Sequence, residues 1–406
     1  MRTWKDTSGS FSIEAEFVSQ DAASVTLRKQ DNREITVPLA KLSSGDRRYL
    51  AQLKPPKASA PKDASRSVSP LPARLSKKAD FQFSQTPLPE VVEIFRQEHR
   101  LPILLDRQAL EEIGLEITTE ISYSKSNVSV ADALTELLNP HSLEWTIDHG
   151  AVIVTSKDNA ENRQSTRVYR VNRGANAVSA IVSLTKEIVP DSWEETGGPG
   201  SSAVLPPHFL IISQRQLVHQ QIMSKYARTL TLVAHRPITL EALQVNMPVE
   251  FLLKPMELGV IEGTVSEVAG KLSEAAGAKI TVDEQAMQSI GLSPDTPITV
   301  DLTELPLIDA LILAVRPLKM TVSINADSII ITTRKADRAN LISARYATGA
   351  LQPNALQNAI NSTTSPDSWQ VLGGPGQMAF TNPGVLEIKQ TLEVHLEIAQ
   401  LLRDLQ

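Results

Sequence analysis

The chain has 406 residues, of which 41% are hydrophobic and 4% aromatic, and a formal net charge of −6. The acidic balance gives no basis for binding nucleic acid or an anionic membrane, and no apolar run is long enough for an integral membrane helix. The absence of cysteine excludes disulfides, thiolate catalysis and cysteine-based zinc or iron–sulfur centres.

Residues 1–53 are predicted to form a small β domain. Apolar and polar residues alternate over 11–17, which is the period of a strand with one buried face. Similar patterns at 25–28 and 34–37 predict two more strands joined by a turn. A helix is expected over 43–53.

These N-terminal residues resemble the first Sla homology domain (SHD). The resemblance rests on Arg2-Thr3-Trp4, Ser8-Gly9-x-Phe11-x-Ile13-Glu14-Ala15-x-Phe17, Val25-x-Leu27-x-Lys29 and Ile35-x-Val37-Pro38-Leu39-x-Lys41-Leu42-Ser43-x-x-Asp46-x-x-Tyr49. It implies an SH3-like β-barrel that binds Asn-Pro-Phe-x-Asp peptides. The peptide-binding candidates are then Arg28, Lys29, Arg33 and Trp4, with Lys29 placed to meet the Asp of the peptide. The alternative for the cations is a solvated strand end.

Residues 54–79 are predicted to be an extended linker. They contain five prolines, many Ser and Ala residues, and seven cations against the single acid Asp63. Such a composition cannot bury a core. The first interpretation is a solvated spacer, and the second is an electrostatic tether for acidic polymers.

The rest of the chain is predicted to be a duplicated α+β unit. Residues 87–157 align without a gap with residues 264–334 at a shift of 177 positions, so that Asp132-Ala133-Leu134 matches Asp309-Ala310-Leu311. Each of these stretches is expected to fold in the order βαββαββ. The first modules are assigned to 80–160 and 257–335, the second modules to 161–230 and 336–406, and the connector to 231–256.

The second module of each copy is expected to fold as βαββα, with Tyr169 matching Tyr346. It contains the most specific repeated phrase, Pro-Asp-Ser-Trp, then three residues, then Gly-Gly-Pro-Gly. Pro, Asp and Gly favour turns, whereas a phosphate-binding loop usually carries a Lys and leads into a helix. We therefore interpret both phrases as structural loops with semi-buried tryptophans. Their residues are Trp193, Gly197, Gly198 and Gly200 in the first copy, and Trp369, Gly373, Gly374 and Gly376 in the second.

The duplicated unit resembles the periplasmic N-domains of secretins. The first modules are similar to the secretin and TonB short N-terminal (STN, N-zero) domain, and the second modules to the N-one type. The resemblance rests on the start Phe81-Gln82-Phe83-Ser84-Gln85-Thr86-Pro87-Leu88, the Asp132-Ala133-Leu134 helix, the hairpin end Val152-Ile153-Val154-Thr155, and Tyr169-Arg170-Val171. No pore-forming β-rich segment follows, so we expect a protein built from secretin-type modules rather than a secretin channel.

Residues with catalytic or metal-binding chemistry are few. His219 and His395 occupy equivalent positions in the two closing helices, and each is expected at a helix surface or cap. His149 has Ala326 as its counterpart, and the acidic pair Glu111-Glu112 is replaced by Gln288-Ser289. No metal site, cofactor or nucleophile motif is therefore predicted.

The sequence thus predicts a non-enzymatic interaction protein, with an SH3-like peptide binder tethered to two copies of an STN/N-one-like scaffold. One alternative is an envelope secretion or signalling component that self-associates through its repeats, and another is a hydrolase of an envelope polymer. No signal peptide precedes Trp4. We expect the cell envelope if a signal peptide has been removed, and the cytoplasm otherwise.

Overall fold

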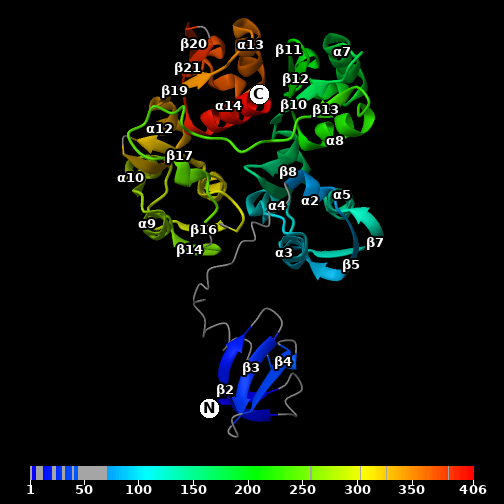
Figure 1. Ribbon diagram of the computed structural model, residues 1–406, viewed down its shortest axis with the longest axis vertical. Coiled ribbons are helices and arrows are strands. Elements are labelled where there is room, and N and C mark those ends of the chain that lie inside the picture. The colour runs from blue at the N-terminus through cyan, green and yellow to red at the C-terminus, as the bar shows by residue number, and fades with distance from the viewer. Residues whose placement is uncertain are drawn as a thin grey trace. The chain divides into compact units, whose positions relative to one another are not determined.

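The computed structural model describes residues 2–5, 12–20, 24–29, 33–38, 41–43 and 71–406, with the exception of residues 257, 302, 326 and 383. The chain forms two compact units, residues 1–68 and 69–406, whose elements are labelled in Figure 1. The helix expected over 43–53 and the linker as far as residue 70 lie outside the described residues.

The first unit contains an antiparallel sheet of four strands in the order β1-β2-β3-β4. Because side chains alternate along a strand, one face collects the buried residues Trp4, Ala15, Val25 and Leu27, which pack with Leu42. The four-stranded sheet agrees with the expected β domain, and the SH3-like barrel stays a prediction. The strands are β1 (Arg2–Lys5), β2 (Ser12–Gln20), β3 (Ser24–Lys29) and β4 (Glu34–Pro38).

The first module of copy 1 combines a two-stranded sheet, β5-β7, with a three-stranded sheet, β6-β9-β8. Asp106 and Ser129 begin the two helices α4 and α5 by accepting hydrogen bonds from backbone N–H groups in the first turn. The elements are α2 (Leu71–Leu75), β5 (Lys78–Pro87), α3 (Leu88–His99), β6 (Ile103–Leu105), α4 (Arg107–Glu112), β7 (Glu120–Ser129), α5 (Val130–Leu138), η2 (Asn139–His141), β8 (Leu143–Asp148), β9 (Ala151–Ser156) and α6 (Lys157–Glu161).

The second module of copy 1 is a four-stranded antiparallel sheet in the order β11-β12-β10-β13, with α7 and α8 on one face. Its last strand forms because Leu230 to Leu232 pair with β10. The elements are β10 (Ser165–Val171), α7 (Ala177–Glu187), η3 (Pro190–Ser192), η4 (Glu194–Thr196), β11 (Ser201–Leu205), β12 (Phe209–Gln214), α8 (Gln216–Lys225) and β13 (Leu230–Leu232).

Copy 2 repeats the sheet pairings of copy 1, with three described strands, β19-β21-β20, where copy 1 has four. The connector instead contributes Leu243, which forms an antiparallel bridge to Ala344 of β19. The elements are η5 (Glu250–Leu253), β14 (Val260–Thr264), α9 (Val265–Ala276), β15 (Ile280–Val282), α10 (Glu284–Ser289), β16 (Pro297–Asp301), α11 (Leu307–Val315), η6 (Arg316–Leu318), β17 (Met320–Asn325), β18 (Ser328–Thr333), α12 (Arg334–Ala339), β19 (Ile342–Ala347), α13 (Pro353–Thr363), η7 (Pro366–Ser368), η8 (Gln370–Leu372), β20 (Gln377–Asn382), β21 (Val385–Gln390) and α14 (Leu392–Asp404).

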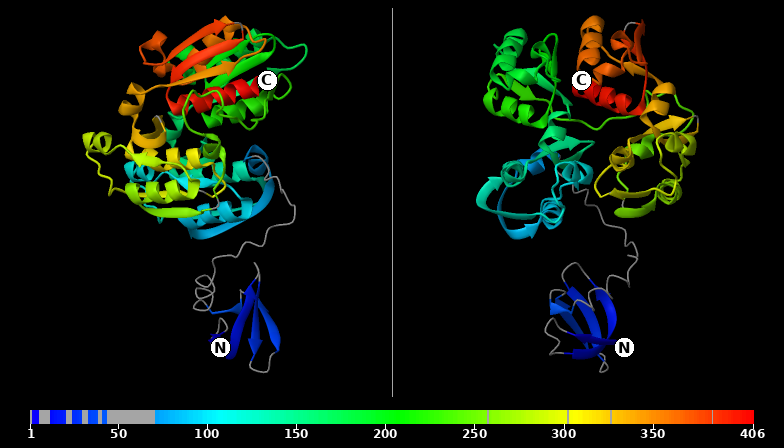
Figure 2. Two further views of the ribbon diagram at one scale, coloured as in Figure 1. Left: turned by 60° about the vertical axis from the view of Figure 1, so that its left-hand side comes forward. Right: turned by 180° about the vertical axis from the view of Figure 1, so that it is seen from behind.

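One hydrophobic cluster spans both copies, beside two further clusters that lie within copy 1. The second modules lie side by side (Figure 2), and α13 and α14 of copy 2 contact the sheet of copy 1. Leu205 and Ile211 of copy 1 are fully buried in the same cluster as the core of copy 2. The two copies therefore pack against each other and are not separate domains joined only by the connector.

The predicted multidomain α/β organisation with small sheets is confirmed. The boundaries differ in two places. Residues 71–79, assigned to the linker from composition, form α2 and the start of β5, because Leu75 is buried against the first module. The second module of copy 1, expected to end at residue 230, extends to Leu232, since the alternating Leu-Thr-Leu segment that follows α8 pairs as β13.

Candidate functional site

The two repeated loops, residues 189–200 and 365–376, have the same backbone. Gly197 and Gly373 have φ of 90° and 91°, a conformation that disfavours any side chain. A Cβ on Gly200 or Gly376 would lie within 3.0 Å of the buried glutamine amide beside it. That glutamine, Gln214 in copy 1, donates hydrogen bonds from Nε2 to the carbonyl and Oγ of the loop serine. In copy 2, Gln390 does the same.

The tryptophans of these loops lie in the core. Trp193 and Trp369 are each 1% exposed. The indole Nε1 of Trp193 donates to the Ile188 carbonyl at 2.7 Å, and that of Trp369 to the Thr364 carbonyl at 2.8 Å. Each indole therefore anchors its loop to the end of the preceding helix, α7 or α13, and the geometry is that of a packed structural element.

His219 and His395 are core residues, so the expected surface or cap position is wrong. Both are fully buried, and each Nδ1 lies 2.8 or 2.9 Å from the Oη of the matched Tyr169 or Tyr346. Each Nε2 donates to a backbone carbonyl, at 2.8 Å from Ser165 and 2.9 Å for copy 2. Burial lowers the pKa of both imidazoles, to about 4 for His395. The neutral rings join the closing helices to the first strand of each sheet.

The four peptide-binding candidates of the first unit do not form one patch. Trp4 is 1% exposed, and its Nε1 donates to the Ala15 carbonyl at 3.1 Å. It is a core residue, so the expected role as a peptide shelf is wrong. Arg28 and Lys29 are consecutive in β3 and point to opposite faces. Lys29 lies on the face of the buried core, half-exposed, whereas Arg33 is exposed beyond the strand end.

A charged cluster joins the two copies where the β8–β9 turn meets copy 2. His149 Nδ1 lies 2.8 Å from Asp309 of α11, and its Nε2 lies 3.4 Å from Glu393 of α14. Arg316 forms ion pairs with Glu393, at 2.6 Å, and with Asp148. Each group therefore contacts a group of opposite charge from the other copy or from a neighbouring element.

The pKa values in this cluster favour the charged forms. Burial would lower the pKa of His149, but hydrogen bonds from its ring to Asp309 and Glu393 outweigh burial and raise the pKa to about 10. Burial would raise the pKa of Glu393, but the His149 hydrogen bond and the Arg316 charge lower it to about 2. Burial and the charge of Glu393 raise the pKa of the nearby Glu397 to about 7, because they outweigh the hydrogen bond from Ser365. The cluster therefore links copy 1 to copy 2 through ion pairs.

Sequence reasoning did not find this cluster, although the alignment of the copies contained the signal. His149 was considered only as an unduplicated metal ligand. The loss of duplication is consistent with this role, because a residue that contacts the other copy is needed in one copy only, as with His149 and its counterpart Ala326.

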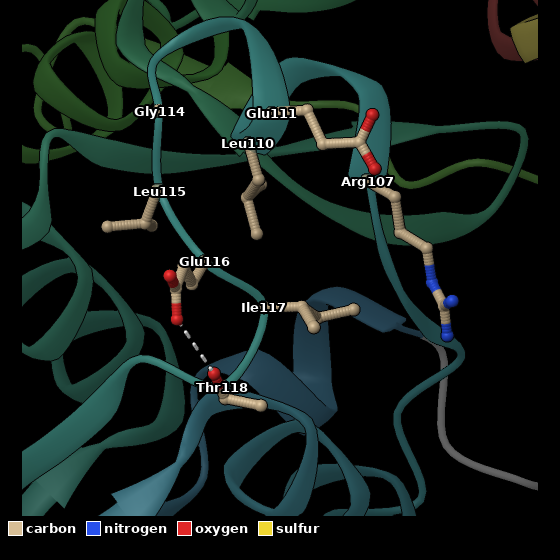
Figure 3. Close-up of a pocket in the computed structure, with 8 residues that line it drawn as sticks. All are labelled: Arg107, Leu110, Glu111, Gly114, Leu115, Glu116, Ile117 and Thr118. Carbon is tan, nitrogen blue, oxygen red and sulfur yellow. Dashed lines mark hydrogen bonds between the residues drawn. The ribbon is translucent and has the colours of Figure 1, made fainter.

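A surface hollow of about 520 Å³ lies between α4 and the loop that follows it. Figure 3 shows Leu110 and Ile117 pointing into the space between the helix and the loop. Glu116 lies on the loop, where its carboxylate accepts a hydrogen bond from Thr118 at 3.4 Å. The hollow is lined by Arg107, Leu110, Glu111, Gly114, Leu115, Glu116, Ile117 and Thr118.

Among the described residues, no three histidine or acidic side chains are placed to hold a metal ion. No helix there is long and apolar enough to cross a membrane.

Comparison with known proteins places the N-terminal unit. Residues 1–57 match the family model described as SLA1 homology domain 1, SHD1. The resemblance of this unit to the Sla homology domain is thereby confirmed. No curated protein sequence matches the chain.

Two solved structures show a weak likeness to the chain. The first is the GspC-GspD complex of the type II secretion system of enterotoxigenic Escherichia coli, with 12% identity, covering 37% of this chain and 98% of that chain, at a TM-score of 0.16. The second is the structure of XcpQN012, with 13% identity, covering 81% of this chain and 99% of that chain, at a TM-score of 0.16. These TM-scores are too low to assign a role to the two copies.

Proposed function

We propose that the chain is a non-enzymatic interaction scaffold, in which the SHD1 unit captures an extended peptide and the duplicated unit supplies a rigid platform. The SHD1 match over residues 1–57 carries this proposal. In the described sheet β4 is an edge strand, and an edge strand can accept a peptide through backbone hydrogen bonds.

We place the acidic anchor of the peptide at Lys29. Its neighbours on the same face, Val25 and Leu27, are buried, so its half-exposed ammonium lies where the apolar face meets solvent. A charge at the margin of an apolar surface selects a partner by its sign. The Asp of an Asn-Pro-Phe-x-Asp peptide fits this position.

The test is fluorescence anisotropy of the full chain with a labelled Asn-Pro-Phe-x-Asp peptide and its scrambled form. The expected result is saturable binding of the first peptide, weakened several-fold by Lys29→Glu. Lys41→Glu is the matched control, because it makes the same charge change at an exposed position of the same unit. Equal binding of both peptides would remove this function.

The platform is proposed to be a closed pair of copies rather than one segment of a ring. The apolar sheet face of copy 1 that receives α13 and α14 is replaced in copy 2 by a polar face. There Arg345 and Glu387 form an ion pair at 2.6 Å, and Thr381 is exposed. The matched pairs, with copy 1 first, are Val168 and Arg345, Leu205 and Thr381, and Ile211 and Glu387.

In repeat proteins, the last repeat needs a polar outer face to stay soluble, and the polar sheet face of copy 2 fits this role. We therefore expect sedimentation velocity to show a monomer over a concentration series. A mass that rises with concentration would support the alternative of a self-associating envelope component.

A further inference from the structure

The hollow beside α4 presents apolar side chains of the following loop to solvent. Leu110 is buried at its base, and Leu115 and Ile117 of the loop are partly exposed around it. Figure 3 shows α4 on one side of the hollow and the loop that follows it on the other. Its volume of about 520 Å³ lies within the range of about 300–1,000 Å³ typical of ligand pockets.

The rim of the hollow is acidic. Glu111 and Glu116 line it, and Glu112 and Glu120 are exposed next to them in the sequence. Arg107 is the single cation of the lining. Within the described part of the chain, none of the four carboxylates takes part in an ion pair. Their negative charge is therefore available to a partner.

The second copy shows that the fold does not need these charges. It builds the same helix and loop, α10 followed by residues 290–296, and keeps apolar residues at the base, Met287 and Leu292. All four acidic positions are uncharged there, although Glu284 and Asp295 stand at the positions of Arg107 and Thr118. The counterparts of Glu111, Glu112, Glu116 and Glu120 are Gln288, Ser289, Ser293 and Pro297.

We propose that this hollow docks a short segment of a partner protein in which apolar side chains alternate with Lys or Arg. An apolar side chain of the partner would cover Leu115 and Ile117, and flanking cations would meet Glu111 and Glu116. Opposite charges around an apolar contact set specificity and orientation. This surface belongs to the second unit and is independent of peptide capture by the first.

The expected loss of peptide affinity can be worked out from the strength of exposed ion pairs. Each such pair contributes roughly 1.5- to 5-fold in affinity. Loss of both carboxylates should therefore weaken binding between about 2- and 30-fold, and salt should weaken it as well.

The experiment uses the full chain and a labelled peptide, Gly-Lys-Leu-Lys-Leu-Lys-Gly, followed by anisotropy. Its controls are the peptide with Glu in place of Lys and the peptide with Gly in place of Leu. The double variant Glu111→Gln with Glu116→Gln makes both positions uncharged, as in copy 2. The matched variant Glu262→Gln with Glu274→Gln removes two exposed carboxylates from copy 2 that lie outside α10 and its loop. Thermal unfolding of each variant verifies the fold.

We expect the chain to bind the first peptide and neither control peptide. The copy 1 double variant should weaken this binding. The copy 2 variant and Lys29→Glu should leave it unchanged. Installing Gln288→Glu with Ser293→Glu should add a second site. Equal binding of the Glu peptide, or equal binding by both double variants, would overturn the proposal. Self-association that the copy 1 variant abolishes, without peptide binding, would also overturn it in favour of a second copy as occupant.

Discussion

Replacement of Trp369 by Ala should strongly destabilise the second unit. The indole is 1% exposed and lies in the cluster shared by both copies. Truncating a buried Trp to Ala costs about 3–5 kcal/mol. Trp369→Phe keeps most of the packing but leaves the Thr364 carbonyl without its Nε1–H donor, which costs about 1–3 kcal/mol.

The free energy of unfolding would be measured by urea titration with far-UV circular dichroism, comparing midpoints at constant slope. Val371→Ala is the matched control, because this side chain in the same loop is 69% exposed and should change stability by less than about 0.5 kcal/mol. All four tryptophans are at most 2% exposed, so iodide should quench the native fluorescence poorly. A loss below about 1 kcal/mol for Trp369→Ala, or quenching as strong as that of free indole, would refute the packed-loop reasoning.

Four further outcomes are expected. Gly376→Ala should destabilise the second unit, because a Cβ there would overlap the Gln390 amide. Gly270→Ala, whose Cβ would lie in open space, should stabilise the unit by about 0.4–1 kcal/mol. Equal effects of the two variants in urea titration would contradict this. Ile211→Glu, which copies the residue of copy 2 into a buried face, should cost about 4 kcal/mol or more in the same assay. Folding raises the pKa of His149, so its contribution is complete below pH 6.5 and is lost as the pH rises through about 10; the stability advantage of the parent over His149→Gln should shrink across that range. Limited proteolysis should cut first within residues 54–70, and first cuts in the connector would contradict the burial of its leucines.

Several features of this fold could be predicted because they are local or repeated in the sequence. The period of apolar residues predicts the strands and helices, and the shared Pro-Asp-Ser-Trp phrase predicts two equivalent loops. The residues of the SHD1 resemblance are likewise contiguous and could be recognised without a fold. The boundary predicted at residue 230 divides the strand Leu230–Leu232, because nothing local shows that β10 has a free edge for this segment to join.

Contacts between segments far apart in the chain were decided by the tertiary structure alone. His149 and Glu393 are 244 positions apart, and only the packing of one copy against the other brings them together. The burial of His219 likewise depends on which face of α8 meets the sheet. The prediction that Trp4 belongs to a peptide-binding surface was wrong for the same reason. An aromatic residue in a β pattern suits a core or a binding surface equally well, and only its neighbours in the fold decide between them. The sequence by itself determined the repeat and its elements, and the tertiary structure determined which surfaces remain free for a partner, because burial is a property of the packed chain and not of any segment.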